Sequence, residues 1–368
     1  MAVNLAEKYS KRVDEKFAEK SITNKMGGLD FDIIGVDTVK VYQINNAEEH
    51  DYTREGSNRY GEPEELGDEV NTYKMTQDKS FSFTIDKGNR TQQMMIKEAG
   101  KRLAAQINNV SNPNRDRYNL HTVSAFAKLI GNVKSNNGIT KSNIYEKFLS
   151  VMEEMDEAGI PTEGRLCYAK PSMYNLLKRS EEFTKFIDAG KKIKINGSIG
   201  DIDDTAIIKA KSKYFPAGVD MIFVHPKVCS TPKQLADYKI HDNPPGINGW
   251  LCEGRMIYDC FFSEANKNGI WIIASGVGLT TYSRAGKTTN STRLNVVKPN
   301  IQKNVTYKYK LDTSSITAPA DGSTTLTGYT DLPKEGTEIA ASTNTHYMII
   351  AVKDGAVFMS GGGELVKK

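Results

Sequence analysis

The sequence lacks any long apolar run. No stretch approaches the roughly 20 consecutive apolar residues that a membrane-spanning helix needs, and the opening MAVNLAEKYSKRVDEKF is too highly charged for a secretory signal. We therefore expect a protein without membrane contact that is made in the cytoplasm and stays there. The rest of the composition is globular, because 38% of the 368 residues are hydrophobic, enough to build real cores.

Cysteine is scarce, and its spacing excludes the common zinc and redox motifs. The four cysteines form no CxxC pair and stand among apolar neighbours. They are Cys167, Cys229, Cys252 and Cys260. We predict free, buried thiols rather than disulfides or zinc ligands.

A strong excess of one charge is also missing. Lys and Arg number 49 against 45 Asp and Glu, which gives a net charge of +4. A protein that neutralises many phosphates would concentrate far more positive charge. Sequence-specific binding of nucleic acid is therefore not expected.

No catalytic or metal-binding set emerges from the motifs. The stretch Asp201-Ile-Asp203-Asp204 lacks the Gly and the distal Glu of an EF-hand, so a turn between strands is favoured over a Ca²⁺ or Mg²⁺ site. Residues 361–363, three glycines without a following Lys-Ser/Thr, are no P-loop and are predicted to be a flexible tail. The five histidines are scattered: His50, His121, His225, His241 and His346. We expect no enzyme, no cofactor and no metal.

The first third of the chain suggests an arm and a long hairpin. Leu5, Tyr9, Val13 and Phe17 recur every four residues, as in an amphipathic helix. Residues 39–44 and 81–85 alternate like half-buried strands and are predicted to be two legs of one hairpin. About twenty residues each way could reach on the order of 60 Å. The tip is strongly acidic and has little to pack with, so a neighbouring molecule should stabilise it; disorder is the alternative.

Helices and strands mix in the remainder, which predicts an α+β fold. An apolar helical face begins near Asn89, and Pro113 is expected to end that helix. A second helix runs from about Ser142 to Gly159, Pro171 starts a third, and short apolar strands follow up to residue 273. The composition after residue 276 predicts a small separate β domain that contains a hairpin turning at Asp354-Gly355.

Two groups of lysines could touch phosphate, although alternating lysines usually form only the solvated face of a strand. They are Lys191, Lys192 and Lys194, and Lys209, Lys211 and Lys213. We hypothesise instead that such cation-rich faces meet the acidic hairpin of a neighbour.

Several stretches resemble one known family. They are Arg165-Leu-Cys-Tyr-Ala169, the run from Asn196 to Asp203, the run from Tyr238 to Gly246, Glu253-Gly-Arg255 and Tyr258-Asp259. Over roughly residues 1–275, these stretches and the order of elements resemble the Hong Kong 97 type major capsid proteins of tailed phages. The resemblance implies a shell subunit that assembles into pentamers and hexamers around double-stranded DNA.

The resemblance also implies a division of the chain. The expected parts are an N-terminal arm (1–35), an extended loop (36–88), a peripheral domain with a spine helix (89–139), an axial domain (140–255), return strands of the peripheral domain (256–276) and a C-terminal β-rich accessory domain (277–368). The contact residues expected between subunits are Glu48, Glu49, Asp51, Arg54, Glu64, Glu65, Lys191, Lys192, Tyr238 and His241.

The partners implied are other copies of the chain, a separate scaffolding protein, a portal and packaged DNA contacted without sequence preference, with a decoration protein as a further candidate. The implied location is the capsid of a virion. Two alternatives stay open: a cellular nanocompartment shell on the same fold, and a surface protein that binds glycans through the C-terminal β domain.

Overall fold

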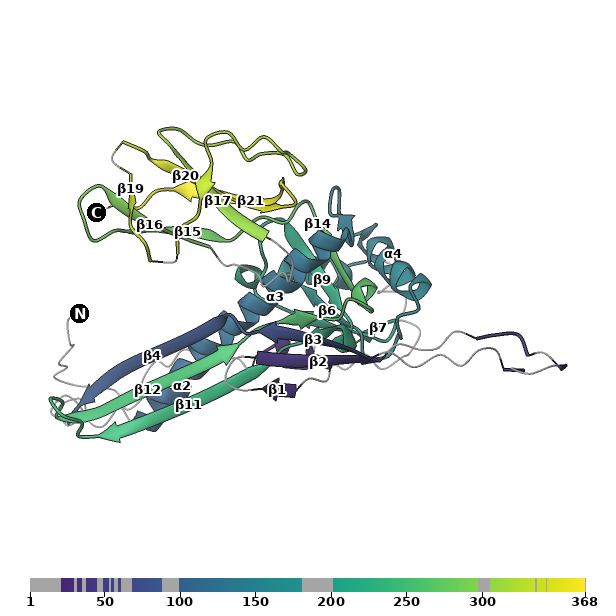
Figure 1. Cartoon of the computed structure of the whole chain (residues 1–368), viewed down its shortest axis with the longest axis horizontal. Helices are drawn as coiled ribbons and strands as arrows, with labels where there is room; N and C mark the ends of the chain where they lie inside the picture. The colour runs from purple at the N-terminus through teal and green to yellow at the C-terminus, as the bar shows by residue number, and fades with distance from the viewer. Residues whose placement is uncertain are drawn as a thin grey trace.

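Two sheets and one long helix set the architecture of the computed structural model. It describes residues 21–29, 32–34, 38–44, 49–52, 54–55, 59–60, 68–87, 99–180, 201–296, 305–334, 336–341 and 343–367. Figure 1 shows a long three-stranded sheet extending to one side of a six-stranded sheet, with the long helix running along both and the C-terminal strands above. The amphipathic helix predicted before Phe17 lies outside the described residues.

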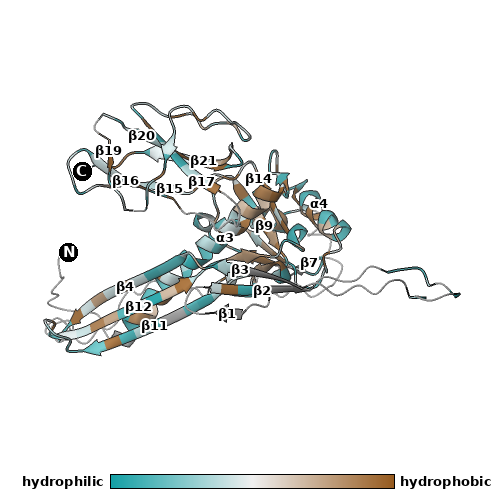
Figure 2. Cartoon of the chain, viewed as in Figure 1, coloured by the Kyte–Doolittle hydropathy of each residue, from teal (hydrophilic) through white to brown (hydrophobic). Residues whose placement is uncertain are grey.

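The six-stranded sheet is covered by helices on both faces. Successive side chains of a strand point to opposite faces. Leu166 and Tyr168 accordingly join the apolar cluster under the long helix, whereas Cys167 and Ala169 join the cluster under α4. Its order is β5-β14-β9-β6-β8-β7, with β5 Val133–Ser135, β6 Leu166–Ala169, β7 Asp201–Ile202, β8 Thr205–Lys209, β9 Val219–Val224 and β14 Ile270–Ala274. Figure 2 shows the resulting apolar centre, where β9, β14 and the long helix meet.

The second and third predicted helices are confirmed. They are α4 (Ile144–Glu157), followed by Gly159 at a φ of 69°, and α5 (Pro171–Lys178), with its proline in the first turn. Arg165, only 1% exposed, fixes the loop after α4 by binding the Asp156 carboxylate at 2.6 Å and the Pro161 carbonyl at 2.9 Å.

The long helix does not end at Pro113, so that prediction was wrong. It runs through α2 (Ala99–Gln106), a π-helical turn η2 (Ile107–Ser111) and α3 (Asn112–Ile130). A proline ring normally clashes with the carbonyl four residues earlier. The wider π turn directly before Pro113 makes room for the ring, and the helix continues.

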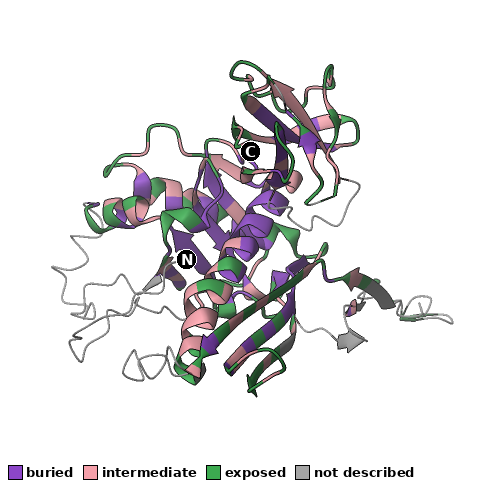
Figure 3. Ribbon diagram, turned by 90° about the vertical axis from the view of Figure 1, so that its left-hand side faces the viewer, coloured by how far each residue is buried: buried purple, intermediate pink, exposed green. Residues whose placement is uncertain are grey.

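The long sheet pairs strands that are far apart in sequence. Its order is β11-β12-β4, with β4 Gln77–Asp86, β11 Lys233–Asp242 and β12 Gly249–Tyr258. Residues 233–255 therefore lie in a different sheet from the rest of 140–255, and the expected boundary at 255 falls inside β12. Figure 3 shows buried and exposed positions alternating along this sheet.

The predicted hairpin exists, but one of its expected legs was wrong. β2 (Thr38–Ile44) pairs with β3 (Asp68–Lys74) in an antiparallel register from Thr38↔Lys74 to Ile44↔Asp68. β1 (Asp32–Ile34) adds to the other edge of β2. The chain then turns at Met75 and Thr76 into β4, which pairs with β12 instead. The alternation of apolar residues could not reveal that residues 68–74 pair in one sheet and residues 77–86 in another.

The C-terminal residues form two sheets that share a core with α3. Leu294, Ile349 and Met359 belong to the same apolar cluster as Leu120 of α3, so the β unit is not separate in its packing. The glycines 361–363 lie in β21 rather than in the predicted flexible tail. The turn at Asp354-Gly355 is confirmed, with φ of 51° and 81°. The strands are β15 Thr281–Ala285, β16 Ser291–Val296, β17 Val305–Asp312, β18 Thr330–Asp331, β19 Ile339–Ala340, β20 His346–Lys353 and β21 Ala356–Glu364.

Short elements complete the fold. Those described are η1 Thr23–Lys25, η3 Ser212–Tyr214, η4 Pro226–Val228, η5 Lys267–Gly269, and the paired strands β10 Cys229–Ser230 and β13 Phe261–Phe262. All four cysteines are free and buried, as predicted.

Candidate functional site: the hairpin, its root and a cationic groove

The hairpin carries its tip far from the body of the chain. In Figure 1 the described tip residues between 49 and 60 lie well beyond the ends of β2 and β3. Two tyrosines of the tip, Tyr52 and Tyr60, are 52% and 85% exposed and contact each other edge to face at a centroid distance of 5.1 Å. Exposed aromatic rings of this kind are typical of surfaces that bind another molecule.

The root of the hairpin is fixed by a buried carboxylate. Asp259, 1% exposed, follows β12 and accepts hydrogen bonds from the Thr76 amide at 2.7 Å and the Thr76 hydroxyl at 2.9 Å. It also accepts one from the Tyr118 hydroxyl of α3 at 2.8 Å and one from the Cys260 amide at 2.8 Å. Asp259 therefore joins three segments at the point where the chain passes from β3 to β4.

Burial and hydrogen bonding oppose each other at Asp259. Burial raises the pKa of this carboxyl, and the bonds from Thr76, Cys260 and Tyr118 act in the opposite direction. Burial also raises the pKa of Tyr118, so the phenol stays protonated and can donate. Next to them, burial raises the pKa of Tyr258 to about 12.

A second buried carboxylate holds the segment before the hairpin. Asp116 of α3, 3% exposed, accepts hydrogen bonds from the Ser21 hydroxyl at 2.5 Å, the Ile22 amide at 3.0 Å and the Thr23 hydroxyl at 2.7 Å. The neighbouring Arg115 donates to Ser21 at 2.8 Å and to Asn24. The long helix therefore anchors both the N-terminal segment and the hairpin root.

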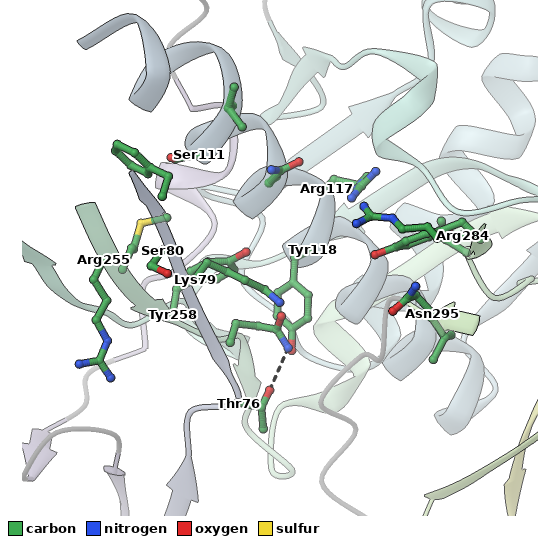
Figure 4. Close-up of a pocket in the computed structure, with 18 of the residues that line it drawn as sticks. Thr76, Lys79, Ser80, Ser111, Arg117, Tyr118, Arg255, Tyr258, Arg284 and Asn295 are labelled. Carbon is green, nitrogen blue, oxygen red and sulfur yellow. Dashed lines mark hydrogen bonds between the residues drawn. The ribbon is translucent and has the colours of Figure 1, made fainter. Parts of the chain in front are cut away.

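A groove of about 960 Å³ lies between the long sheet, the long helix and the C-terminal strands. Its lining includes Lys79 of β4, Arg117 of α3, and Tyr282 and Arg284 of β15, and contains no Asp or Glu among the described residues. We call it the cationic groove. Figure 4 shows Arg117 and Arg284 on one side of it, with Lys79 and Tyr118 nearer the centre.

Three of its cations, Lys79, Arg117 and Arg284, form no salt bridge within the described part of the chain. The charge of Lys79 nevertheless helps to lower the pKa of the neighbouring Asp78. The guanidinium of Arg284 lies 5.1 Å from the centroid of the Tyr282 ring. A fourth cation, Arg255, is paired with Asp78 at 2.6 Å and 3.0 Å, and this contact lowers the pKa of Asp78. The groove is thus built to attract an anion.

The described residues among those predicted to lie between subunits fall in two separate places. Glu49, Asp51 and Arg54 are exposed at the hairpin tip. Glu48, Glu64, Glu65, Lys191 and Lys192 lie outside the described residues. Tyr238 and His241 lie on β11 of the long sheet, away from the tip.

Both β11 residues have contacts within the chain. The Tyr238 ring stacks on Phe81 at a centroid distance of 6.1 Å, and both rings lie over Gly254 of β12. His241 Nε2 lies 3.3 Å from Glu253 Oε2. Both residues fall within the expected axial domain (140–255), but their strand belongs to the long sheet and not to the six-stranded sheet.

The structure tests two further predictions from the sequence. Asp203 and Asp204 have φ of 50° and 54° and form the two-residue turn of the β7–β8 hairpin, as expected. Lys209, Lys211 and Lys213 are exposed, and Lys209 and Lys213 each lie over a tyrosine ring.

Within the described ranges, no three potential ligands gather into a metal site, and no helix is long and apolar enough to cross a bilayer.

Sequence reasoning missed Asp259, Thr76, Arg117 and Arg284. Tyr258-Asp259 belongs to a stretch that carried the resemblance, but only the fold brings its partners Thr76 and Tyr118 within reach. The two arginines stand 167 positions apart, and no local signal relates them.

Comparison with known proteins gives the fold. No protein-family model matches the sequence, and no curated protein matches it. Among solved structures, the capsid of cyanophage P-SCSP1u matches with a TM-score of 0.57 at 12% identity, covering 73% of this chain and 92% of that one. The asymmetric unit of the bacteriophage PhiM1 mature capsid matches with a TM-score of 0.52 at 12% identity, covering 73% of this chain and 91% of that one. A chain from Mycobacterium phage Che8 matches with a TM-score of 0.51 at 15% identity, covering 73% of this chain and 96% of that one.

These similarities lie in structure far more than in sequence. The chain has the Hong Kong 97 type α+β fold of phage capsid chains, which confirms the fold class expected from the sequence.

Proposed function

We propose that this chain is the major capsid protein of a tailed phage, a structural subunit that self-assembles into a closed shell and catalyses no reaction. The observation that carries the proposal is the hairpin, which holds an exposed Tyr52–Tyr60 pair far from its own body. A two-stranded ribbon is only marginally stable by itself in water. A neighbouring copy would supply the surface that the ribbon lacks.

The proposed division of labour follows the sheets. The six-stranded sheet with α4 and α5 would meet its copies at the centres of pentamers and hexamers, as an axial domain. The long helix and the long sheet would form the peripheral domain, and the hairpin would be the extended loop that lies over an adjacent subunit. The β unit after residue 276 would be an accessory domain. Many modest interfaces of this kind, each of roughly 800 Å² per partner, add up to a strong closed shell.

The proposed partners are the chain itself, a separate scaffolding protein and a portal, with a decoration protein as a further candidate. The shell would assemble in the cytoplasm of a bacterial host and enclose double-stranded DNA. The net charge of +4 supports weak, non-specific contact with DNA, because a strongly basic inner wall would grip the genome.

Electron microscopy and sedimentation test the proposal. The full chain is purified, alone and with a candidate scaffolding protein from the same genome, and particle mass is measured alongside negative-stain images. Closed shells, or discrete pentamers and hexamers, are expected.

A well-folded protein that stays monomeric in both preparations would overturn the proposal. Shells that package a specific enzyme instead of DNA would favour the nanocompartment alternative, which uses the same fold.

A further inference from the structure

We propose that the cationic groove is the docking site for the acidic hairpin tip of a second copy of the chain, so that the C-terminal β unit acts as one wall of a receptor for its neighbour. This inference rests on the proposed shell function and goes beyond it, because it assigns a partner segment to a defined site and a role to the C-terminal unit.

The groove has more positive than negative charge along its lining. Lys79, Arg117 and Arg284 come from three different elements and, within the described residues, none of them forms a salt bridge with a carboxylate. A site lined by cations and free of carboxylates attracts an anion through its summed positive potential. The groove volume of about 960 Å³ is near the top of the roughly 300–1,000 Å³ typical of ligand pockets. It can hold a stretch of chain rather than a single ion.

The hairpin tip has the complementary charge. Residues 45–67 contain seven acidic residues and two arginines, so the net charge is 2 − 7 = −5. Since the whole chain carries +4, the remainder carries 4 + 5 = +9. The tip is therefore a strongly negative segment on an otherwise positive molecule, and this asymmetry favours contact between copies.

Aromatic residues match as well. The tip exposes Tyr52 and Tyr60, and the groove offers the Tyr282 ring and the arginine stacked on it at 5.1 Å. Tyrosine and arginine are the side chains that contribute most at the centres of protein interfaces.

The tip cannot reach the groove of its own chain. Figure 1 shows the hairpin leaving the body in the direction opposite to the long sheet, whose strands β4 and β12 border the groove. The occupant must then come from another copy, which gives a head-to-tail contact that can close into a ring.

The test is direct binding of a labelled peptide. A fluorescein-labelled peptide of residues 45–67 is titrated with the full-length protein, at a concentration where sedimentation shows separate subunits, and fluorescence anisotropy gives the Kd. The variant Arg117→Glu/Arg284→Glu reverses two groove charges. The matched control Lys209→Glu/Lys213→Glu makes the same charge change on two cations outside the groove, each of which lies over a tyrosine ring as Arg284 does.

We expect the groove variant to weaken binding by about tenfold or more, and the control to change it much less, with an affinity that falls as salt rises. Arg284 is exposed, so Arg284→Glu alone serves as the readout if the double variant does not fold, as judged by circular dichroism. Equal losses in the two double variants, a greater loss in the control, or no binding by the wild type would overturn the inference.

The same preparations separate this inference from the proposed function. If the wild type forms shells but peptide binding does not depend on the groove charges, the docking site is refuted and the shell function is supported. If peptide binding depends on the groove charges but no shells form, even with scaffold, the shell function is refuted and the contact between copies is supported.

Discussion

Tyr118 and Asp259 are joined by a buried hydrogen bond of 2.8 Å from the tyrosine hydroxyl to Oδ1 of the carboxylate. They are 141 positions apart, and their bond ties the long helix to the corner after β12. Since Asp259 also holds Thr76, this contact decides how firmly the hairpin is attached to the body.

Removing the Tyr118 hydroxyl should loosen the hairpin root. Tyr118→Phe leaves the ring in place but takes one donor from a buried carboxylate, so we expect a loss of about 1–3 kcal/mol in the free energy of unfolding. Hydrogen exchange at the Thr76 amide should speed up as well. Urea unfolding and exchange mass spectrometry measure the two effects.

The control for this prediction is Tyr282→Phe, which removes a hydroxyl from a partly exposed ring on β15. Combining Tyr118→Phe with Thr76→Val should give a non-additive loss, because both residues bind Asp259. Strict additivity in that cycle would mean that Asp259 does not couple the two segments.

Acid should destabilise the protein through His121. This side chain is 4% exposed, its Nδ1 lies 3.1 Å from the Thr280 hydroxyl, and burial, reinforced by Arg117, lowers its pKa to about 3. In the unfolded chain the pKa is about 6.5. The unfolded state therefore binds more protons between pH 6.5 and 3, and the stabilising contribution present above pH 6.5 is lost as the pH falls.

The slope due to this one group is at most about 1.4 kcal/mol per pH unit. Urea unfolding at pH 7.5, 5.5 and 4.5 should show a steeper loss for the wild type than for His121→Gln, with His346→Gln as the matched histidine control. Parallel pH profiles for wild type and His121→Gln would refute this assignment.

Gly254 should tolerate no side chain. A Cβ at this position would stand 2.6 Å from the Phe81 ring and 2.7 Å from the Tyr238 ring, closer than real Cβ contacts. We expect Gly254→Ala to cost about 1–3 kcal/mol, because the two rings must move apart.

Gly100→Ala is the opposite case. A Cβ there meets nothing within 4 Å, and the residue lies in α2, so the same substitution should stabilise by roughly 0.5–1 kcal/mol. Thermal unfolding of both variants, with opposite shifts of Tm, is the expected result. A stable Gly254→Ala protein would show that the two rings are not constrained as described.

Local patterns in the sequence were enough to predict many of the elements. The glycine stop after α4, the first-turn proline of α5, the turn at Asp354-Gly355 and the alternation in β2 all depend on residues that are neighbours along the chain. The same holds for the four buried thiols and for the α+β class. The negative charge of the hairpin tip could also be predicted from the sequence, since charge is a property of composition.

Tertiary structure alone decided which strands pair and which side chains meet. β4 joins β12 instead of β2, and Asp259 meets Thr76, because sheet pairing and burial depend on contacts between distant segments. Pro113 sits within a continuous helix because a π turn precedes it. The cationic groove exists only where β4, α3 and β15 come together, and periodicity cannot encode such a site, since it records only which face of an element is apolar.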